Sequence, residues 1–272
     1  MSIVDAVILA IVQGLTEFLP VSSSGHLVLG REILGVANQG DDVAFEVVVH
    51  FGTFLAVLMV YWQDIKALLS TFFSTVMKPA TLPSAYQTNS KFKLSILMIL
   101  AMIPAGIVGL FFEEELASLF GNPKLVAGML ILTGLILFFT RWVSKRATTV
   151  LNPWRAILIG MAQAVAIIPG VSRSGSTIST ALLLGIDRKE AARFSFIMVL
   201  PLIFGALILQ LLKLNEMGID QAGIETLLAG LVTSFVIGWA SLKWLIGMLE
   251  RGHFHWFAYY CFAIGFIGLM YA

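Results

Sequence analysis

The 272-residue chain is 58% hydrophobic and only 12% charged, and its mean hydropathy of +0.93 excludes an ordinary soluble domain. A net charge of +1 without a basic tail excludes the positive surface on which nucleic-acid binding depends. The single cysteine, Cys261, excludes an intramolecular disulfide and is interpreted as a small apolar side chain. The composition therefore predicts an integral membrane protein.

Six segments are apolar and long enough to cross a bilayer, which takes roughly 20 residues of helix. In chain order, these predicted spans are 43–62, 94–112, 125–141, 194–212, 226–243 and 254–272. A loop at 78–90, which contains Pro79, Pro83 and mostly polar residues, is predicted to be a flexible linker.

Two further apolar regions, 3–36 and 154–186, are interrupted in the middle by proline, glycine and a run of hydroxyl side chains. Proline removes a backbone donor and stops a helix, whereas glycine and serine suit a tight reversal. Each region is therefore predicted to be a re-entrant helical hairpin that dips into the membrane and returns. The predicted fold class is an all-α integral membrane protein with six transmembrane helices and two such hairpins.

The number of spans sets the topology. Each hairpin is followed by three spans, and because three is odd, the second half of the chain starts from the opposite face of the membrane. We therefore predict two inverted-topology repeats, 1–145 and 150–272, within one membrane domain that covers residues 1–272. The hairpin tips then meet near the midplane, where proteins of this kind place a binding site.

The basic residues orient this arrangement. One face of the predicted membrane domain carries 13 of the 17 lysines and arginines. These are Lys66, Lys78, Lys91, Lys93, Arg141, Lys145, Arg146, Arg155, Arg188, Lys189, Arg193, Lys243 and Arg251. Positive loops usually stay in the cytoplasm, so both termini and the predicted site are expected to face the outer side.

Two related motifs lie at the interruptions of the two apolar regions. The first runs Gln13-Gly14-Leu15-Thr16-Glu17-Phe18-Leu19-Pro20-Val21-Ser22-Ser23-Ser24-Gly25-His26. The second runs Gln163-Ala164-Val165-Ala166-Ile167-Ile168-Pro169-Gly170-Val171-Ser172-Arg173-Ser174-Gly175-Ser176-Thr177. They share Gln, Val, Ser, Ser and Gly in register, and they carry a carboxylate, an imidazole and a guanidinium. Ionisable groups at membrane depth usually mark a functional site.

Arg173 indicates an anion site. Its guanidinium is permanently charged and matches the geometry of a phosphate or carboxylate. A helix expected to begin near Ser174–Thr177 would direct its N-terminal amides at the same anion. The alternative is a structural ion pair between Arg173 and Glu17, which leaves the surrounding hydroxyl groups without a role.

Glu17 lies four residues after Gln13, on the same face of a helix. Its carboxylate fits three roles that do not exclude one another. With the Gln13 oxygen it can hold a hard divalent cation that bridges to a diphosphate. It can act as a general base, or it can simply neutralise Arg173.

His26 follows the serine triplet at the start of the returning helix. A serine with a nearby histidine can form a nucleophile and its base. A lone histidine at such a position is more often a local hydrogen-bonding group. The matched set of Glu17, Ser23, His26 and Arg173 favours the catalytic interpretation here.

On these residues, the chain resembles the bacterial undecaprenyl-diphosphatase family, also called bacitracin resistance protein, over essentially its whole length. The resemblance rests on the two long motifs, which stand here as Gln13 to His26 and Pro169 to Thr177. It implies hydrolysis of undecaprenyl diphosphate to undecaprenyl phosphate at the outer face of the bacterial cytoplasmic membrane. That reaction recycles the lipid carrier for cell-wall synthesis, and it implies a divalent cation, Mg²⁺ or Ca²⁺, as cofactor.

By position, Glu17, Ser23, His26 and Arg173 match the family's active-site residues, and Glu17 is the candidate metal ligand. The residues expected to bind the diphosphate are Gln13, Ser22, Ser24, Gln163, Ser172, Ser174, Ser176 and Thr177. In the mechanism that we expect, Ser23 attacks the terminal phosphorus and His26 handles the proton. Direct attack by water, with His26 or Glu17 as base, is the alternative.

A transporter or flippase for a prenyl phosphate lipid is the alternative from a different functional class. Inverted repeats with broken helices are common in carriers, so architecture does not separate the two functions. The pairing of serine with histidine favours the enzyme, because a carrier has no need of a nucleophile. Besides the lipid substrate and membrane lipids, a homodimer is a possible assembly, since Gly128, Gly134, Gly265 and Gly268 form faces that suit helix packing.

Overall fold

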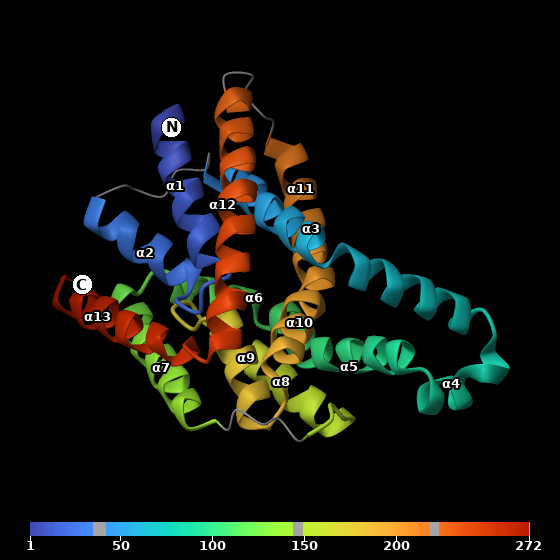
Figure 1. Cartoon of the computed structure of the whole chain (residues 1–272). Coiled ribbons are helices and arrows are strands. Elements are labelled where there is room, and N and C mark those ends of the chain that lie inside the picture. The colour runs from blue at the N-terminus through green and yellow to red at the C-terminus, as the bar shows by residue number, and fades with distance from the viewer. Residues whose placement is uncertain (35–41, 144–148, 218–222, 272) are drawn as a thin grey trace.

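The computed structural model describes residues 1–34, 42–143, 149–217 and 223–271. Within these ranges all regular secondary structure is helical, which confirms the all-α prediction (Figure 1). The first half of the chain contains α1 (Ile3–Thr16), α2 (Ser23–Leu34), α3 (Asp42–Val76), η1 (Pro79–Thr81), α4 (Leu82–Thr88), α5 (Ser90–Phe111), α6 (Glu113–Leu119), α7 (Pro123–Phe139) and η2 (Thr140–Trp142). The second contains α8 (Pro153–Val165), α9 (Arg173–Leu183), α10 (Arg188–Met198), α11 (Leu200–Met217), α12 (Ile224–Arg251), η4 (Phe254–Trp256) and α13 (Phe257–Tyr271).

Among the described residues, six helical segments are long and apolar enough to cross a membrane. They are 44–76, 90–111, 123–142, 188–208, 224–251 and 254–271, and each contains or overlaps one of the six predicted spans. The chain is therefore a multi-pass membrane protein. The two predicted hairpins are also present as helix–turn–helix units, α1–α2 and α8–α9.

Three features differ from the sequence prediction: the end of the first span, the segment 78–90 and the fourth span. The first span was expected to end at residue 62, but α3 continues to Val76, with its only non-helical backbone at Tyr61. Neither glycine nor proline occurs between Thr53 and Lys78, so nothing stops the helix before Pro79. The predicted flexible linker at 78–90 was wrong, because η1 and α4 occupy most of it.

The fourth span also differs, because it is built from two helices. α10 ends at Met198 and α11 begins at Leu200. Pro201 cannot donate the hydrogen bond that would join the two helices, which accounts for the interruption.

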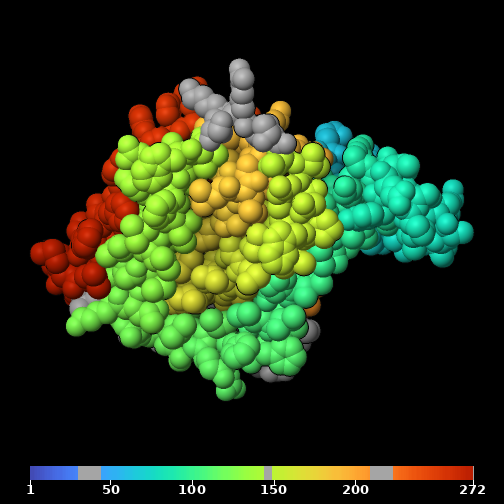
Figure 2. All heavy atoms as spheres, turned by 90° about the horizontal axis from the view of Figure 1, so that it is seen from below, coloured from blue at the N-terminus to red at the C-terminus, as the bar shows by residue number. Residues whose placement is uncertain are grey.

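Each hairpin packs its first helix against a long helix of the other half. α1 lies along α12, and α8 lies along α5, while α3 packs on α12 and α13 on α7. As a result the turn between α1 and α2 faces the turn between α8 and α9 near the centre of the molecule (Figure 1). The last part of α3, α4 and the start of α5 project from this body as an arm, seen in cyan in Figure 2. The inverted-repeat relation and the boundaries 1–145 and 150–272 stay predictions.

The glycines proposed to lie at helix interfaces mostly pack within the chain. A Cβ on Gly134 would collide with the Phe262 ring, and one on Gly265 would collide with Ile131 on α7. One on Gly268 would lie 3.0 Å from Leu29 of α2. These three glycines therefore bring α13 against α7 and α2. A homodimer stays a prediction.

Candidate active site at the hairpin tips

The two hairpin turns use the same capping interactions at positions 150 residues apart. The Gly25 amide donates to Ser22 Oγ (3.2 Å), and the Gly175 amide donates to Ser172 Oγ (3.1 Å). In each turn the capping hydroxyl also contacts the second serine after it, at 3.2 Å for Ser24 and 3.3 Å for Ser174. The capped helices begin at Ser23 and at Arg173. Helix α9 thus starts slightly earlier than the expected Ser174–Thr177.

The two turns also touch each other reciprocally. A Cβ on Gly25 would lie 3.3 Å from Gly170 Cα, and a Cβ on Gly175 would lie 3.3 Å from Pro20 Cβ. Each glycine therefore allows its own turn to approach the turn of the other hairpin. This contact sets Ser23 and Arg173, which occupy equivalent positions, on either side of one carboxylate.

The second turn is anchored to α7 by a residue outside the motifs. Thr133 Oγ1 donates to the Gly170 carbonyl oxygen (3.1 Å) and accepts from the Ser172 amide (3.0 Å). Thr133 is only 1% exposed. Gly170 itself has φ +91°, and a Cβ there would collide with the Val126 carbonyl oxygen of α7. The turn therefore needs glycine for its conformation as well as for space.

Gly170→Ala is expected to lower the free energy of unfolding by about 2–3 kcal/mol, because it combines positive φ with overpacking. The matched control is Gly106→Ala on α5, where a Cβ would meet nothing within 4 Å. That variant should be neutral or slightly stabilising, since alanine favours a helix more than glycine does. Thermal unfolding in detergent compares the two. Equal melting temperatures for both variants would contradict the packing that places this turn on α7.

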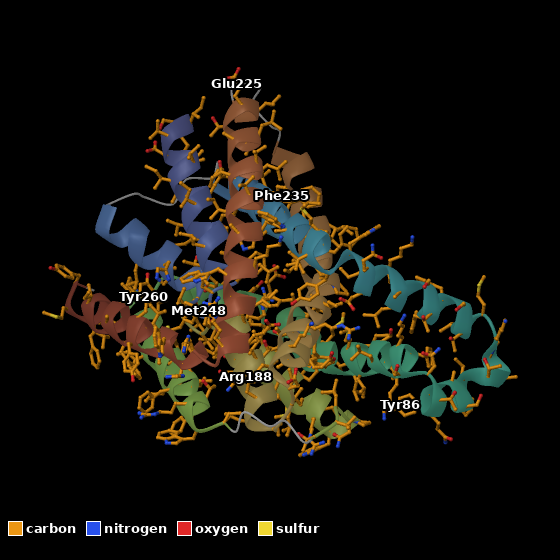
Figure 3. All side chains as sticks on the ribbon, viewed as in Figure 1. Tyr86, Arg188, Glu225, Phe235, Met248 and Tyr260 are labelled. Atoms are coloured by element: carbon orange, nitrogen blue, oxygen red, sulfur yellow. The ribbon has the colours of Figure 1, made fainter. Side chains whose placement is uncertain are left out.

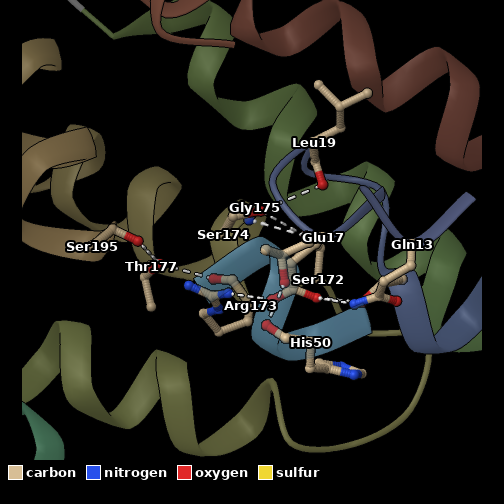
Figure 4. Close-up of polar contacts among 12 residues, drawn as sticks. Gln13, Glu17, Leu19, His50, Ser172, Arg173, Ser174, Gly175, Thr177 and Ser195 are labelled. Carbon is tan, nitrogen blue, oxygen red and sulfur yellow. Dashed lines mark hydrogen bonds and ion pairs between the residues drawn. The ribbon is translucent and has the colours of Figure 1, made fainter. Parts of the chain in front are cut away.

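Glu17 is the centre of the polar network at the tips (Figure 4). Its Oε1 accepts from Arg173 Nη2 at 2.7 Å, in an ion pair that joins the two hairpins. Its Oε2 accepts from Gln13 Nε2 and from Ser23 Oγ, both at 3.0 Å. The Arg173 and Glu17 side chains are only 16% and 9% exposed. The ion pair considered as an alternative from the sequence is therefore present, and its carboxylate also accepts a hydrogen bond from the predicted nucleophile.

A small polar cavity of about 80 Å³ lies over this network. It is lined by Thr16, Glu17, Ser22, Ser23, Ser24, Ala166, Val171, Ser172 and Arg173. The lining therefore joins residues of both hairpins and carries one positive and one negative charge. A larger cavity of about 670 Å³ between α4, α5 and α10 contains no residue of either motif.

Two buried atoms of the network have no hydrogen-bond partner within the described part of the chain. They are Arg173 Nη1 and Gln13 Oε1. One is a charged donor and the other is a neutral acceptor, and leaving such groups unpaired costs stability. Atoms of this kind in a native structure usually bond a water, an ion or a ligand. The unpaired guanidinium nitrogen suits an anion, and the unpaired amide oxygen suits a cation.

His26 makes different contacts from those expected. Its Nδ1 lies 2.9 Å from the Ser22 carbonyl oxygen, and its Nε2 lies 2.8 Å from the Tyr260 hydroxyl. Both ring nitrogens are therefore engaged away from Ser23. The hydroxyl of Ser23 donates to Glu17 instead, so in this structure Glu17 is the base nearest to the predicted nucleophile.

Five of the residues expected at the diphosphate are absent from the lining of the cavity: Gln13, Gln163, Ser174, Ser176 and Thr177. Gln13 contacts Glu17, and Ser174 Oγ donates to the Leu19 carbonyl oxygen. Thr177 Oγ1 contacts the Arg173 carbonyl oxygen and Ser195 Oγ. Ser176 lines a separate apolar groove between α7, α8 and α9. Gln163 is 3% exposed, and neither polar atom of its side chain has a partner among the residues described. Their roles at a substrate stay predictions.

Two residues with direct contacts at the site were missed by the sequence analysis. Thr133 is the only hydroxyl between Lys124 and Thr140, so an isolated polar residue in an apolar span was an available signal. Tyr260 carries no such signal. It follows Tyr259 in the last span, where tyrosine is ordinarily interpreted as an interfacial residue.

Comparison with known proteins identifies the family. The family model described as bacitracin resistance protein BacA matches residues 6–267. The chain belongs to the BacA family. An undecaprenyl-diphosphatase from Salinibacter ruber is 41% identical over 97% of both chains. One from Christiangramia forsetii is 41% identical over 100% of this chain and 99% of its own, and one from Halothermothrix orenii is 39% identical over 97% and 96%.

The BacA match begins within α1 and ends within the last span, so it contains both hairpin turns and all or most of each of the six long helices. The resemblance stated from the two motifs is thereby confirmed for the whole chain. The relatives align over nearly their full lengths, and the region matched by the family model contains both Glu17 and Arg173.

Proposed function

We propose that this chain hydrolyses undecaprenyl diphosphate to undecaprenyl phosphate and inorganic phosphate, recycling the lipid carrier and conferring bacitracin resistance. The observation that carries the proposal is the carboxylate of Glu17, which is only 9% exposed and accepts from a serine hydroxyl of one hairpin and a guanidinium of the other. This arrangement provides a nucleophile, a base and an anion-binding group around one polar cavity. The names of the relatives support the same substrate.

In the first chemical step, Ser23 Oγ attacks the terminal phosphorus. The Oγ–P bond forms, the bond from phosphorus to the bridging oxygen breaks, and its electron pair leaves with undecaprenyl phosphate. The Ser23 proton passes to Glu17 Oε2, which already accepts it in a hydrogen bond of 3.0 Å. The leaving group is a phosphate monoester, so it departs without strong acid assistance.

In the second step, water attacks the phosphoserine and releases inorganic phosphate. Glu17 returns its proton to Ser23 Oγ as the Oγ–P bond breaks, and His26 receives the proton that the water loses. The assignment of this role to His26 rests on its place in the first motif. Direct attack of water on the diphosphate, with Glu17 as base, is the alternative mechanism.

Arg173 would bind the phosphoryl oxygens through Nη1, the nitrogen that has no partner within the described residues. Its charge would stabilise the negative charge that develops on those oxygens in the transition state. The N-terminus of α9, which begins at Arg173, lies beside the same cavity and adds a favourable dipole.

The residues present fit a divalent cation that binds together with the substrate. The lining of the cavity has no net charge, since Glu17 and Arg173 balance, so a diphosphate needs further positive charge. Gln13 Oε1 is a buried oxygen without a partner among the described residues, and Gln13 precedes Glu17, the C-cap residue of α1, by four positions. Among the described residues, no group of three His, Cys, Asp or Glu side chains is placed to hold a metal ion. A hard cation held by Glu17 and Gln13 would therefore complete its shell with phosphate oxygens and neutralise their charge, as is usual for Mg²⁺.

We further propose that the site faces the outer side of the bacterial cytoplasmic membrane. The 13 basic residues of the other face would then stay in the cytoplasm. Labelling of an engineered cysteine at Lys124 or Lys66 in intact cells, in a Cys261→Ala background, tests this orientation. A membrane-impermeant reagent should label position 124 and not position 66, and the reverse pattern would contradict the orientation.

Phosphate release from undecaprenyl diphosphate by the purified protein tests the proposed function. A chelator should lower the rate by at least about 10²-fold, and added Mg²⁺ or Ca²⁺ should restore it, because the cavity cannot neutralise the diphosphate alone. Full activity in chelator would remove the cation from the proposal. No release from a folded wild-type protein would reject the phosphatase and favour the lipid carrier, to be assayed next as transbilayer movement in vesicles.

A further inference from the structure

Tyr260 contacts the imidazole of His26 in two ways. Its hydroxyl lies 2.8 Å from His26 Nε2, and the two rings stack with centroids 5.5 Å apart and planes inclined by 5°. The residues are 234 positions apart, on α13 and α2. Tyr260 lies on α13, on the side of the molecule where α2 begins (Figure 3).

The contact of the other ring nitrogen, Nδ1, defines the tautomer of this histidine. Nδ1 lies 2.9 Å from the Ser22 carbonyl oxygen, which can only accept a hydrogen bond, so Nδ1 carries a proton. In the neutral ring, Nε2 is therefore the acceptor and the Tyr260 hydroxyl donates to it. When the ring gains a second proton, Nε2 becomes the donor and the same hydroxyl oxygen accepts. One contact thus serves both protonation states.

We propose that Tyr260 is a positioning residue for His26, which holds the imidazole with Nδ1 protonated. Because the Tyr260 hydroxyl occupies the Nε2 lone pair, a proton reaches Nε2 only through that hydroxyl, whose oxygen takes up the proton from water as its own proton passes to Nε2. The proposal rests on the acid–base role of His26 in the proposed function. In a serine–histidine–aspartate triad the orienting group bonds the ring nitrogen that does not exchange the proton. The Ser22 carbonyl takes that place here, whereas Tyr260 bonds the nitrogen that exchanges the proton. Tyr260 comes from the last helix of the chain, so it couples α13 to the first hairpin.

Tyr260→Phe removes the hydroxyl and keeps the stacked ring. We expect kcat for undecaprenyl diphosphate to fall about tenfold with KM changed less than twofold, because one hydrogen bond to the acid–base group is lost. Tyr259→Phe is the matched control, since that neighbouring tyrosine contacts Phe138 and not His26. It should stay within twofold of wild type.

A double variant separates positioning from general damage. If Tyr260 acts through His26, adding Tyr260→Phe to His26→Ala should leave the already reduced rate unchanged within twofold. A further tenfold loss in the His26→Ala background would overturn the proposal. Unchanged kcat in the single variant would overturn it as well.

A spectroscopic readout keeps the test independent of activity. The chain has four histidines, so ¹⁵N-histidine spectra of the full protein are simple, and His26→Ala assigns its pair of signals. Tyr260→Phe should shift the Nε2 signal of His26 and leave Nδ1 protonated. An unshifted Nε2 signal would refute the contact. A shifted signal in a protein without phosphate release would reject the reaction and retain the tyrosine–histidine pair.

Discussion

Arg173→Lys is expected to lower the rate of phosphate release by at least about 10³-fold. Lysine keeps the positive charge and can still pair with Glu17, but it has no second nitrogen in a rigid fork. In the structure Nη2 is committed to Glu17 at 2.7 Å, and Nη1 is the atom left for a phosphoryl oxygen. The single ammonium group of a lysine can pair with Glu17 or bind the phosphoryl oxygen, but it cannot do both in the way the two guanidinium nitrogens can.

The control for this substitution is Arg155→Lys. Arg155 lies at the start of α8, where Nη1 donates to the Val150 carbonyl oxygen outside the cavity. It should retain activity within about threefold, since exposed polar contacts contribute little. Wild-type activity of a folded Arg173→Lys variant would mean that Arg173 serves only in the ion pair with Glu17. Phosphate release measured at several substrate concentrations distinguishes loss of binding from loss of kcat.

The sequence was a reliable guide to the spans and to the two hairpin turns, whereas Pro79 and Pro83 did not mark a flexible linker. The six spans and the two hairpins follow from runs of apolar residues and from Pro20 and Pro169-Gly170. The sequence offered the pairing of Glu17 with Arg173 only as the alternative to an anion site, and the structure contains it. Each turn carries one charge of opposite sign, and the ion pair balances the two.

The contacts between distant elements could not be predicted in the same way. Nothing in the pattern of residues 254–272 shows that Tyr260 rather than Tyr259 meets His26, because the rotation of α13 depends on how Gly134, Gly265 and Gly268 pack. The partner of Ser23 was also ambiguous. His26 follows Ser23 by three residues in one helix, but the carbonyl of Ser22 and the hydroxyl of Tyr260 occupy its ring, which leaves Glu17 as the neighbouring base.

Ser23→Ala is expected to lower phosphate release by about 10⁴-fold or more, because it removes the attacking oxygen. Glu17→Gln should cost about 10³-fold, since the amide cannot take the serine proton or balance Arg173. Ser74→Ala is the matched control. Ser74 is exposed, and its Oγ donates to the Thr71 carbonyl oxygen on the projecting arm, far along the chain from either motif.

The same variants identify the intermediate. When substrate labelled in its terminal phosphate is mixed with wild-type protein and quenched within one turnover, the label should be found on the peptide that contains Ser23. Glu17→Gln should form this phosphoserine more slowly, because Glu17 accepts the proton in the first step. His26→Ala should instead accumulate it, because the proposed role of His26 comes after the lipid phosphate has left. Substantial activity of Ser23→Ala, with no label on the wild-type protein, would show that water attacks the diphosphate directly and that Glu17 activates that water.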